Sequence, residues 1–213
     1  VVSIHVSGKL SGTLNSAVQA NKLLNDENAG GNRSDGKEGG MPLEVIDSQL
    51  ASIPLGLAVL EAAAMAAEGG DHLQVAAQVR EGLTRHHGLF ALDTLEFLQK
   101  VGRIDKARAF MGSVLNVKPI LRLQDGEAHP LERPRSRERA MGRLVELAHD
   151  LAPVRQLAVI YSTDSERMAE LKQQLTGLLP ADQIIETRFG STLGTYIGPD
   201  AVGVAVTQEV TQA

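Results

Sequence analysis

The segment VVSIHVSGKLSGT, residues 1–13, decides the fold that we expect for this chain. Its first six residues form an apolar run of the strand type, and residues 8–13 form a turn with two glycines. A helical pattern follows, in which Leu14, Ala17 and Val18 recur at the spacing of one helix face. A strand that leads through a turn into a helix is the unit from which α/β folds are built.

Strand and helix patterns keep alternating up to residue 83. We expect a second strand at residues 43–46 and helices at residues 54–67 and 73–83. This order predicts parallel strands joined by right-handed crossovers, as in a Rossmann-like sheet. Residues 28–40 are glycine-rich and polar, and we expect a flexible surface loop there.

A different order begins after residue 84. The patterns predict strands at residues 88–92, 119–123, 128–132, 157–162, 184–188 and 202–206, and helices at residues 94–100, 106–115, 136–151 and 166–179. Asp125-Gly126 is a strong hairpin signal, and hairpins mixed with helices indicate an α+β arrangement with a largely antiparallel sheet. We therefore expect an α/β chain of two domains, Rossmann-like at residues 1–84 and α+β at residues 85–213. Because the chain opens on Val1 within a strand pattern and without Met, we also expect that an N-terminal part is missing.

Composition narrows the function classes. The 213 residues are 43% hydrophobic and 22% charged, which is typical of a globular protein. Cysteine is absent, which excludes disulfides, thiol nucleophiles and Cys-ligated zinc and fits a cytoplasmic location. The net charge of −5 and the 3% aromatic content argue against nucleic-acid binding. The longest mostly apolar stretch, residues 53–67, is shorter than the about 20 residues of a membrane span.

Several catalytic and metal-binding signatures are absent from the sequence. The six histidines include no H-E-x-x-H motif and no acidic D-x-D cluster occurs, so we expect no metal site. No G-x-S-x-G elbow occurs, which argues against a serine hydrolase. Neither a G-x-G-x-x-G motif nor a Walker loop is present.

The turn after the first expected strand is the best candidate for a binding site. It carries Ser7, Ser11 and Thr13 beside two glycines at a helix N-terminus. Glycines let the backbone approach a ligand, and the free N–H groups and dipole of a helix N-terminus attract an anion. Asp47 and Ser48 end the next expected strand and should lie at the same edge of the sheet. The alternative is that Ser11 or Thr13 only caps the helix.

Two arginine-containing segments are further candidates. Arg103 follows a glycine at an expected helix break, where its guanidinium can bind a carboxylate or phosphate between the two halves. The alternative is a surface arginine in a helix–helix turn. Residues 133–139 (RPRSRER) form a basic patch on an acidic protein; such a run is commonly a solvated face, or it docks an acidic or phosphate-bearing partner.

Six short segments occur in an order that is specific for one family. They are Leu10-Ser11-Gly12-Thr13, Val45-Ile46-Asp47-Ser48, Asp93-Thr94-Leu95-Glu96-Phe97-Leu98, Gly102-Arg103-Ile104, Leu115-Asn116-Val117-Lys118-Pro119-Ile120 and Gly194-Thr195-Tyr196-Ile197-Gly198-Pro199. Each segment alone is a weak signal, but the ordered set spans nearly the whole chain. It resembles the DegV family of bacterial fatty-acid-binding proteins.

The resemblance implies a DegV-like two-domain fold that holds one long-chain fatty acid, such as palmitate or oleate, between its domains. It further implies a carrier without enzymatic activity or cofactor: the fatty-acid-binding subunit of a fatty acid kinase, whose separate ATP-binding subunit phosphorylates the bound carboxylate. By this resemblance Ser11, with Gly12 and Thr13, binds the carboxylate, Arg103 helps to organise it, and Arg135 engages the kinase. A cytoplasmic carrier of this kind also allows transient contact with a membrane surface.

The chain departs from the family pattern at several positions. Tyr196 replaces a histidine, and a phenol with a pKa of about 10 cannot carry protons at neutral pH, although it can donate a hydrogen bond to the carboxylate. Val101, Leu14 and Asp200 replace a glycine, a tyrosine and a glycine. The family's threonine partner of Ser11 belongs to a segment that precedes residue 1.

An enzyme is the alternative to a carrier. The family resembles the substrate-binding fold of dihydroxyacetone kinases, so a kinase-like or phosphatase-like activity on a small anionic substrate at the Ser11 turn stays open. A third reading, nucleic-acid binding through residues 133–139, is disfavoured by the acidity of the chain. The sequence leaves open the length and saturation of the lipid and the identity of the kinase.

Overall fold

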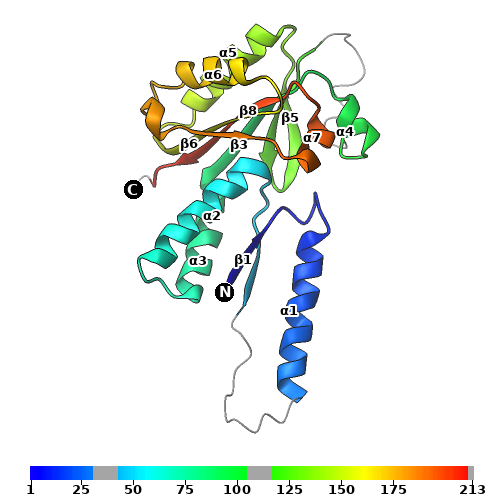
Figure 1. Cartoon of the computed structure of the whole chain (residues 1–213), viewed down its shortest axis with the longest axis vertical. Helices are drawn as coiled ribbons and strands as arrows, with labels where there is room; N and C mark the ends of the chain where they lie inside the picture. Colours follow the sequence, from blue (N-terminus) through cyan, green and yellow to red (C-terminus); the bar gives the residue numbers. More distant parts are fainter. Residues whose placement is uncertain (31–42, 105–116, 211–213) are drawn as a thin grey trace.

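A computed structural model describes residues 1–30, 43–104 and 117–210 of the chain, which form two β-sheets with helices packed around them (Figure 1). The smaller sheet pairs β1 (Val2–His5) with β2 (Glu44–Asp47) in parallel, so that Val2 lies opposite Glu44 and His5 opposite Asp47. Helix α1 (Thr13–Gly30) lies between them in the chain. The parallel pair that the sequence predicts is therefore confirmed.

Helix α1 is longer than the sequence suggests. The expected surface loop begins at residue 28, but residues 28–30 continue the helix. Ala29 is a strong helix former, and the helix ends at Gly30, the first glycine of the run. The remainder of the expected loop, residues 31–40, lies outside the described residues, as does the expected helix at residues 106–115.

The larger sheet has six strands in the order β5-β4-β3-β8-β6-β7. Their bounds are β3 (His86–Ala91), β4 (Ile120–Gln124), β5 (Glu127–Glu132), β6 (Val154–Tyr161), β7 (Ile185–Arg188) and β8 (Val202–Gln208). All neighbouring strands are antiparallel except β6 and β7, which confirms the largely antiparallel sheet. Asp125 and Gly126, both with positive φ, turn the chain between β4 and β5 as the sequence predicts.

The other helices of the described residues are α2 (Ser52–Ala67), α3 (His72–Gly82), α4 (Glu96–Lys100), α5 (Arg137–His149), α6 (Ser165–Gln174) and α7 (Ser191–Ile197), with 3₁₀ turns at Leu83–Arg85 and Ala181–Gln183. Helix α6 ends five residues earlier than expected, shortly before Gly177. Helix α7 was not expected, because seven residues with a glycine and two threonines carry little helix propensity. Its packing against α4 stabilises it instead.

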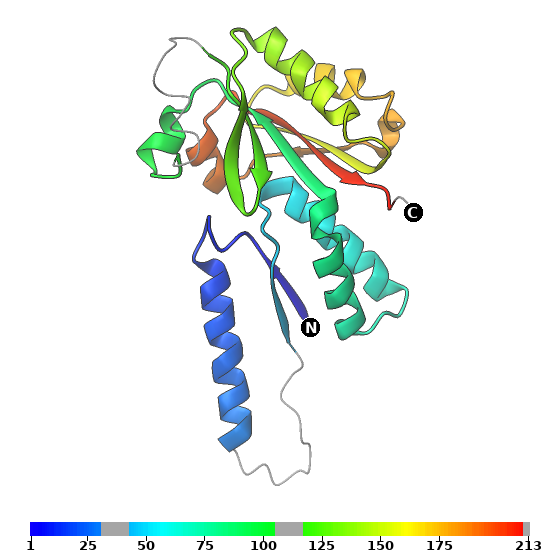
Figure 2. The same cartoon turned by 180° about the vertical axis from the view of Figure 1, so that it is seen from behind.

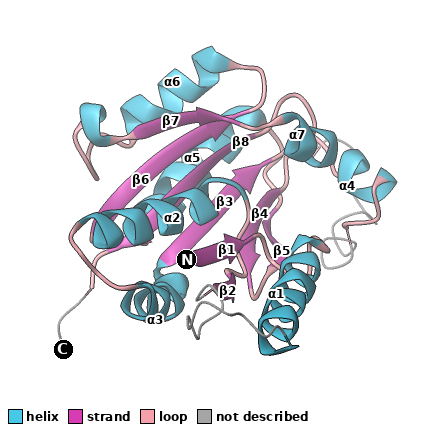
Figure 3. Cartoon of the chain, turned by 60° about the horizontal axis from the view of Figure 1, so that its bottom comes forward, coloured by secondary structure: helices cyan, strands magenta, loops and turns pink. Residues whose placement is uncertain are grey.

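The two faces of the larger sheet have different partners, as Figure 3 shows. In β8, Val202, Val204 and Val206 belong to the core that α5 and α6 cover. The alternate residue Ala205 packs against Leu57 of α2 on the opposite face. The second half of α2 packs with β2 of the smaller sheet, so this helix contacts both sheets. The domain boundary at residue 84 stays a prediction. Among the described residues, no helix has the length and apolarity to cross a membrane.

Candidate functional site

A cavity of about 490 Å³ lies between the larger sheet and the Ser11 loop, residues 6–12, which joins β1 to α1. The sheet and helices α4 and α7 contribute mainly apolar side chains: Phe90, Leu92, Leu98, Leu121, Leu123, Ala128, Phe189, Leu193 and Ile197. The polar residues on its lining are Ser11, Gly12, Thr13, Ser52, Arg103, Thr192 and Tyr196. A mostly apolar cavity with a few polar groups suits a ligand with a long apolar part and a polar end.

The Ser11 loop is ordered by its own hydrogen bonds. The carbonyl of Ser7 accepts from the N–H groups of Leu10 and Ser11, both at 3.0 Å. Ser11 Oγ accepts from Thr13 N at 3.3 Å and from Thr13 Oγ1 at 3.1 Å. Ser11 therefore satisfies an N–H at the start of α1, as the capping alternative requires. Because both contacts use Ser11 Oγ as acceptor, its own hydroxyl proton is free to donate to a ligand.

Asp47 and Ser48, at the end of β2, lie at the same sheet edge as the Ser11 loop, as expected. Gly8 N donates to Asp47 Oδ1 at 3.3 Å, and Ser48 Oγ donates to the carbonyl of His5 at 2.6 Å. The carboxyl ends of β1 and β2 therefore meet beside the Ser11 loop.

Arg103 reaches the Ser11 loop from the far part of the sequence. Gly102, with φ +68°, turns the chain after α4, and Arg103 N donates to the carbonyl of Leu98 at 2.9 Å. The side chain then donates from Nε to the carbonyl of Leu10 at 3.4 Å. Arg103 is exposed, yet it lines the cavity between the two sheets instead of lying on a remote surface turn.

Tyr196 enters the cavity from α7. The end of this helix is fixed, because Ser162 Oγ donates to the carbonyl of Gly198 at 2.8 Å and the Phe97 ring packs against Gly198. Gly198 has φ +85°, and a Cβ there would lie 2.6 Å from the ring. The structure therefore places Ser11, Gly12, Thr13, Arg103 and Tyr196 on one cavity.

Ser52 and Thr192 also line the cavity, although no sequence pattern indicated them. Ser52 begins α2, and Thr192 lies in α7, the helix that the sequence did not reveal. The apolar lining follows a signal that was available, since alternate residues of β4 and β3, such as Leu121 and Leu123, face the same side.

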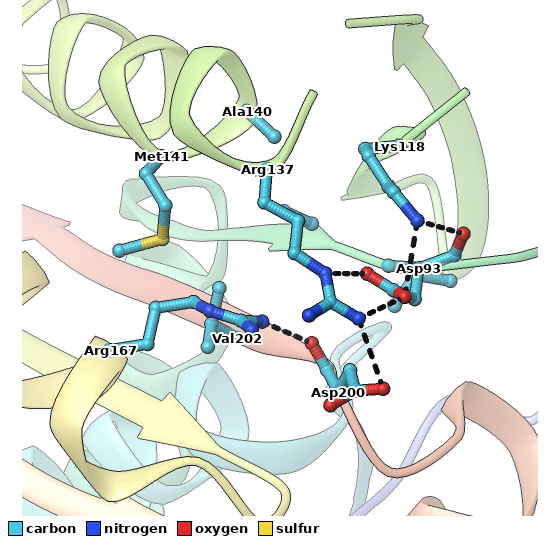
Figure 4. A pocket seen from close by; sticks show the side chains of 10 residues that line it. Asp93, Lys118, Arg137, Ala140, Met141, Arg167, Asp200 and Val202 are labelled. Carbon is cyan, nitrogen blue, oxygen red and sulfur yellow. Dashed lines mark hydrogen bonds and ion pairs between the residues drawn. The ribbon is translucent and has the colours of Figure 1, made fainter. Parts of the chain in front are cut away.

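Figure 4 shows a charged cluster that lines a second, smaller pocket, and Leu92 lines both this pocket and the cavity. Arg137 donates from Nε to Asp93 Oδ1 at 2.7 Å, and its Nη2 contacts the carboxylates of both Asp93 and Asp200. Lys118 Nζ lies 3.1 Å from Asp93 Oδ2, and Arg167 donates to the Asp200 carbonyl at 3.1 Å. The hydrogen bonds from Arg137 lower the pKa of Asp93 below its usual value. Because these cations already have carboxylate or carbonyl partners, the cluster acts as a brace between α5 and the segment after α7.

Arg135 lies outside the cavity lining. It precedes Ser136, whose hydroxyl accepts from Arg139 N at 3.2 Å and caps α5, so the helix begins at Arg137. The Arg135 side chain is exposed and has no hydrogen bond or ion pair with the parts of the chain that the structure describes. Within those same residues, no group of three His, Asp or Glu side chains is arranged to hold a metal ion.

Comparison with known proteins identifies the family. The DegV family model, described as "Uncharacterised protein, DegV family", matches residues 1–209. A DegV domain-containing protein of Streptomyces coelicolor is 35% identical and Protein DegV of Bacillus subtilis is 30% identical; the matches cover 97% and 96% of this chain and 69% of each relative.

Solved structures give the same result. The structure titled "Fatty Acid Binding of a DegV family Protein from Thermus thermophilus" has a TM-score of 0.82 and 30% identity, over 97% of this chain and 70% of that one. The structure of "DegV, a fatty acid binding protein from Bacillus subtilis" has a TM-score of 0.79 and 29% identity, with the same coverage. A family model that matches nearly the whole chain, with a fold shared at this level, shows that the chain belongs to the DegV family.

Proposed function

We propose that this protein binds one long-chain fatty acid, such as palmitate or oleate, in the cavity beneath the Ser11 loop. The cavity is the main support for the proposal, because its lining is largely apolar. At one edge it offers hydrogen-bond donors and a cation, from Ser11, Gly12, Thr13, Arg103 and Tyr196. The Thermus and Bacillus relatives, which are described as fatty-acid-binding proteins, support it.

The head group suits the donors of this edge. A carboxylate can accept from the Ser11 hydroxyl, from N–H groups at the start of α1 other than that of Thr13, which Ser11 Oγ accepts, and from the Arg103 guanidinium. The α1 dipole favours its negative charge. The Tyr196 phenol supplies a further donor. The palmitate tail brings about fifteen CH₂ and CH₃ groups at about 0.8 kcal/mol each, a gross gain on the order of 10 kcal/mol before ordering costs.

A carrier role is favoured over an enzyme. Among the described residues that line the cavity, none is His, Asp, Glu or Lys, so no side chain there is suited to general-base chemistry at neutral pH. The sequence also lacks a Walker loop for ATP. We propose that a separate ATP-binding kinase subunit phosphorylates the bound carboxylate, that Arg135 docks this subunit, and that no cofactor takes part. Such a carrier works in the cytoplasm and exchanges lipid through transient contact with membrane surfaces.

The proposal is tested by extracting the purified protein with organic solvent and analysing the extract by mass spectrometry. We expect a fatty acid in the extract, and saturable binding when the delipidated protein is titrated with palmitate or oleate. Failure of both measurements would contradict fatty-acid binding. Phosphorylation or hydrolysis of a substrate by the isolated protein with ATP, but without a kinase subunit, would contradict the carrier role.

A further inference from the structure

One aromatic side chain shapes the sheet side of the cavity. Phe90 of β3 lines the cavity and lies opposite Gly203 of β8 in the sheet register. A Cβ added at Gly203 would lie 2.6 Å from Phe90 Cδ1, and one added at Gly88 would lie 3.0 Å from Phe90 Cε2. The ring therefore rests against two glycines on neighbouring strands, and it lies this deep only because both positions lack a side chain.

A second aromatic ring, that of Phe189, packs against the Phe90 ring. Phe189 follows β7 and lines the same cavity, and its ring centroid lies 6.0 Å from that of Phe90, with the planes tilted by 53°. Phe189 N donates to the carbonyl of Tyr161 at 2.9 Å, and this hydrogen bond holds the Phe189 backbone in place. Each ring limits the movement of the other, so the space above Phe90 is set by packing.

We propose that Phe90, seated on Gly88 and Gly203, determines which acyl chains the cavity accepts. The proposal rests on the proposed fatty-acid binding and goes further by naming the residue that selects chain length and shape. Protein interiors respond to volume changes of one methylene, and each buried methylene changes affinity about fourfold. A ring that moved toward the cavity would exclude part of a long chain, and a smaller side chain would admit more of it.

Two variants change the cavity volume in opposite directions. Phe90→Leu enlarges the cavity and should improve binding of arachidate and oleate relative to laurate by about tenfold. Gly203→Ala pushes the ring toward the cavity and should weaken arachidate relative to laurate by a similar factor. Dissociation constants for laurate, palmitate, stearate, arachidate and oleate are measured on delipidated wild-type and variant proteins.

Two control variants separate cavity shape from general destabilisation. Leu89→Ala alters the residue before Phe90 in β3, which faces the α5 core, and Gly142→Ala adds a Cβ to α5 that meets no atom within 4 Å beyond the adjacent backbone of that helix. Both should keep the wild-type ranking of acids, whatever their thermal stability. If Gly203→Ala unfolds because its Cβ also approaches Leu89 O, Phe90→Leu decides alone.

The outcomes distinguish this proposal from the one it rests on. An unchanged ranking in Phe90→Leu, with wild-type protein that binds fatty acids, overturns the selector role of Phe90. Wild-type protein that binds none of the five acids overturns fatty-acid binding itself.

Discussion

The hydroxyl of Ser7 donates a hydrogen bond of 2.7 Å to the backbone carbonyl of Gly126, a residue 119 positions further along the chain. The bond joins the Ser11 loop to the tip of the β4–β5 hairpin, which reaches toward this loop in Figure 2. Ser7 is fully buried, and a Cβ at Gly126 would lie 2.5 Å from its oxygen. The contact therefore fixes one wall of the cavity against the other.

We expect Ser7→Ala to destabilise the protein and weaken fatty-acid binding together. The substitution leaves the Gly126 carbonyl without its donor and Lys9 N without the Ser7 acceptor that it has at 3.2 Å. Leaving buried groups unpaired costs about 1–3 kcal/mol, which urea denaturation measures. Ser16→Ala, at an exposed position of α1, is the control. Wild-type stability of Ser7→Ala would show that the contact does not fix the loop.

Ser11→Ala should weaken fatty-acid binding while it leaves the fold intact, with at most the small loss of stability that follows from removing a helix cap. Ser11 is only partly buried, and its lost hydrogen bond to a charged carboxylate is worth about 1.5–3 kcal/mol, or at least tenfold in the dissociation constant. Titration with palmitate measures the loss, and thermal unfolding of the same variant measures its stability. Unchanged affinity would reduce Ser11 to a helix cap.

We expect Arg135→Ala to keep fatty-acid affinity and to reduce acyl-phosphate formation by the cognate kinase. Arg135 is exposed and lies outside the cavity lining, and truncation of an interface arginine costs about 2 kcal/mol. Arg139→Ala, in the same basic run, tests whether charge alone matters and should have the smaller effect. Loss of lipid affinity in Arg135→Ala would assign the residue to the cavity and not to docking.

The stability of the protein should fall as the pH drops below about 6.5, because of His86. Burial lowers the pKa of this histidine from 6.5 to about 4, and the neighbouring Arg85 adds to the effect. The folded protein thus favours neutral His86, and the stability gained above pH 6.5 is lost as the pH falls toward 4. The effect is at most roughly 3 kcal/mol, since the Glu61 carboxylate 3.5 Å away favours the charged form.

His86→Gln removes this titration, and its amide can replace the contact of His86 Nδ1 with Thr207 Oγ1 at 2.9 Å. Denaturation at several pH values between 4 and 7 should show a flatter dependence for the variant. Identical slopes for the two proteins would mean that His86 does not control acid stability.

The elements that are determined by residues close together in the sequence could be predicted. Apolar periodicity predicted the parallel pair β1–β2 and the helix α1 between its two strands, and Asp125-Gly126 predicted the hairpin. The Ser11 turn was recognisable because its glycines and hydroxyls directly precede a helix. These features follow from local backbone preferences, which neighbouring residues set. Helix α7 could not be predicted, because its residues have weak helix propensity and the helix is stabilised by packing.

The cavity itself was decided by tertiary structure. Periodicity indicates which face of a strand is apolar but not which strand lies beside it. The position of β8, the last strand of the described residues, between β3 and β6 could therefore not be predicted. That placement brings Gly203 under Phe90. The contact of Arg103 with the carbonyl of Leu10 joins residues 93 positions apart. Such contacts form only when the whole chain packs into one close-fitting interior, because their free energy depends on partners that no local sequence specifies.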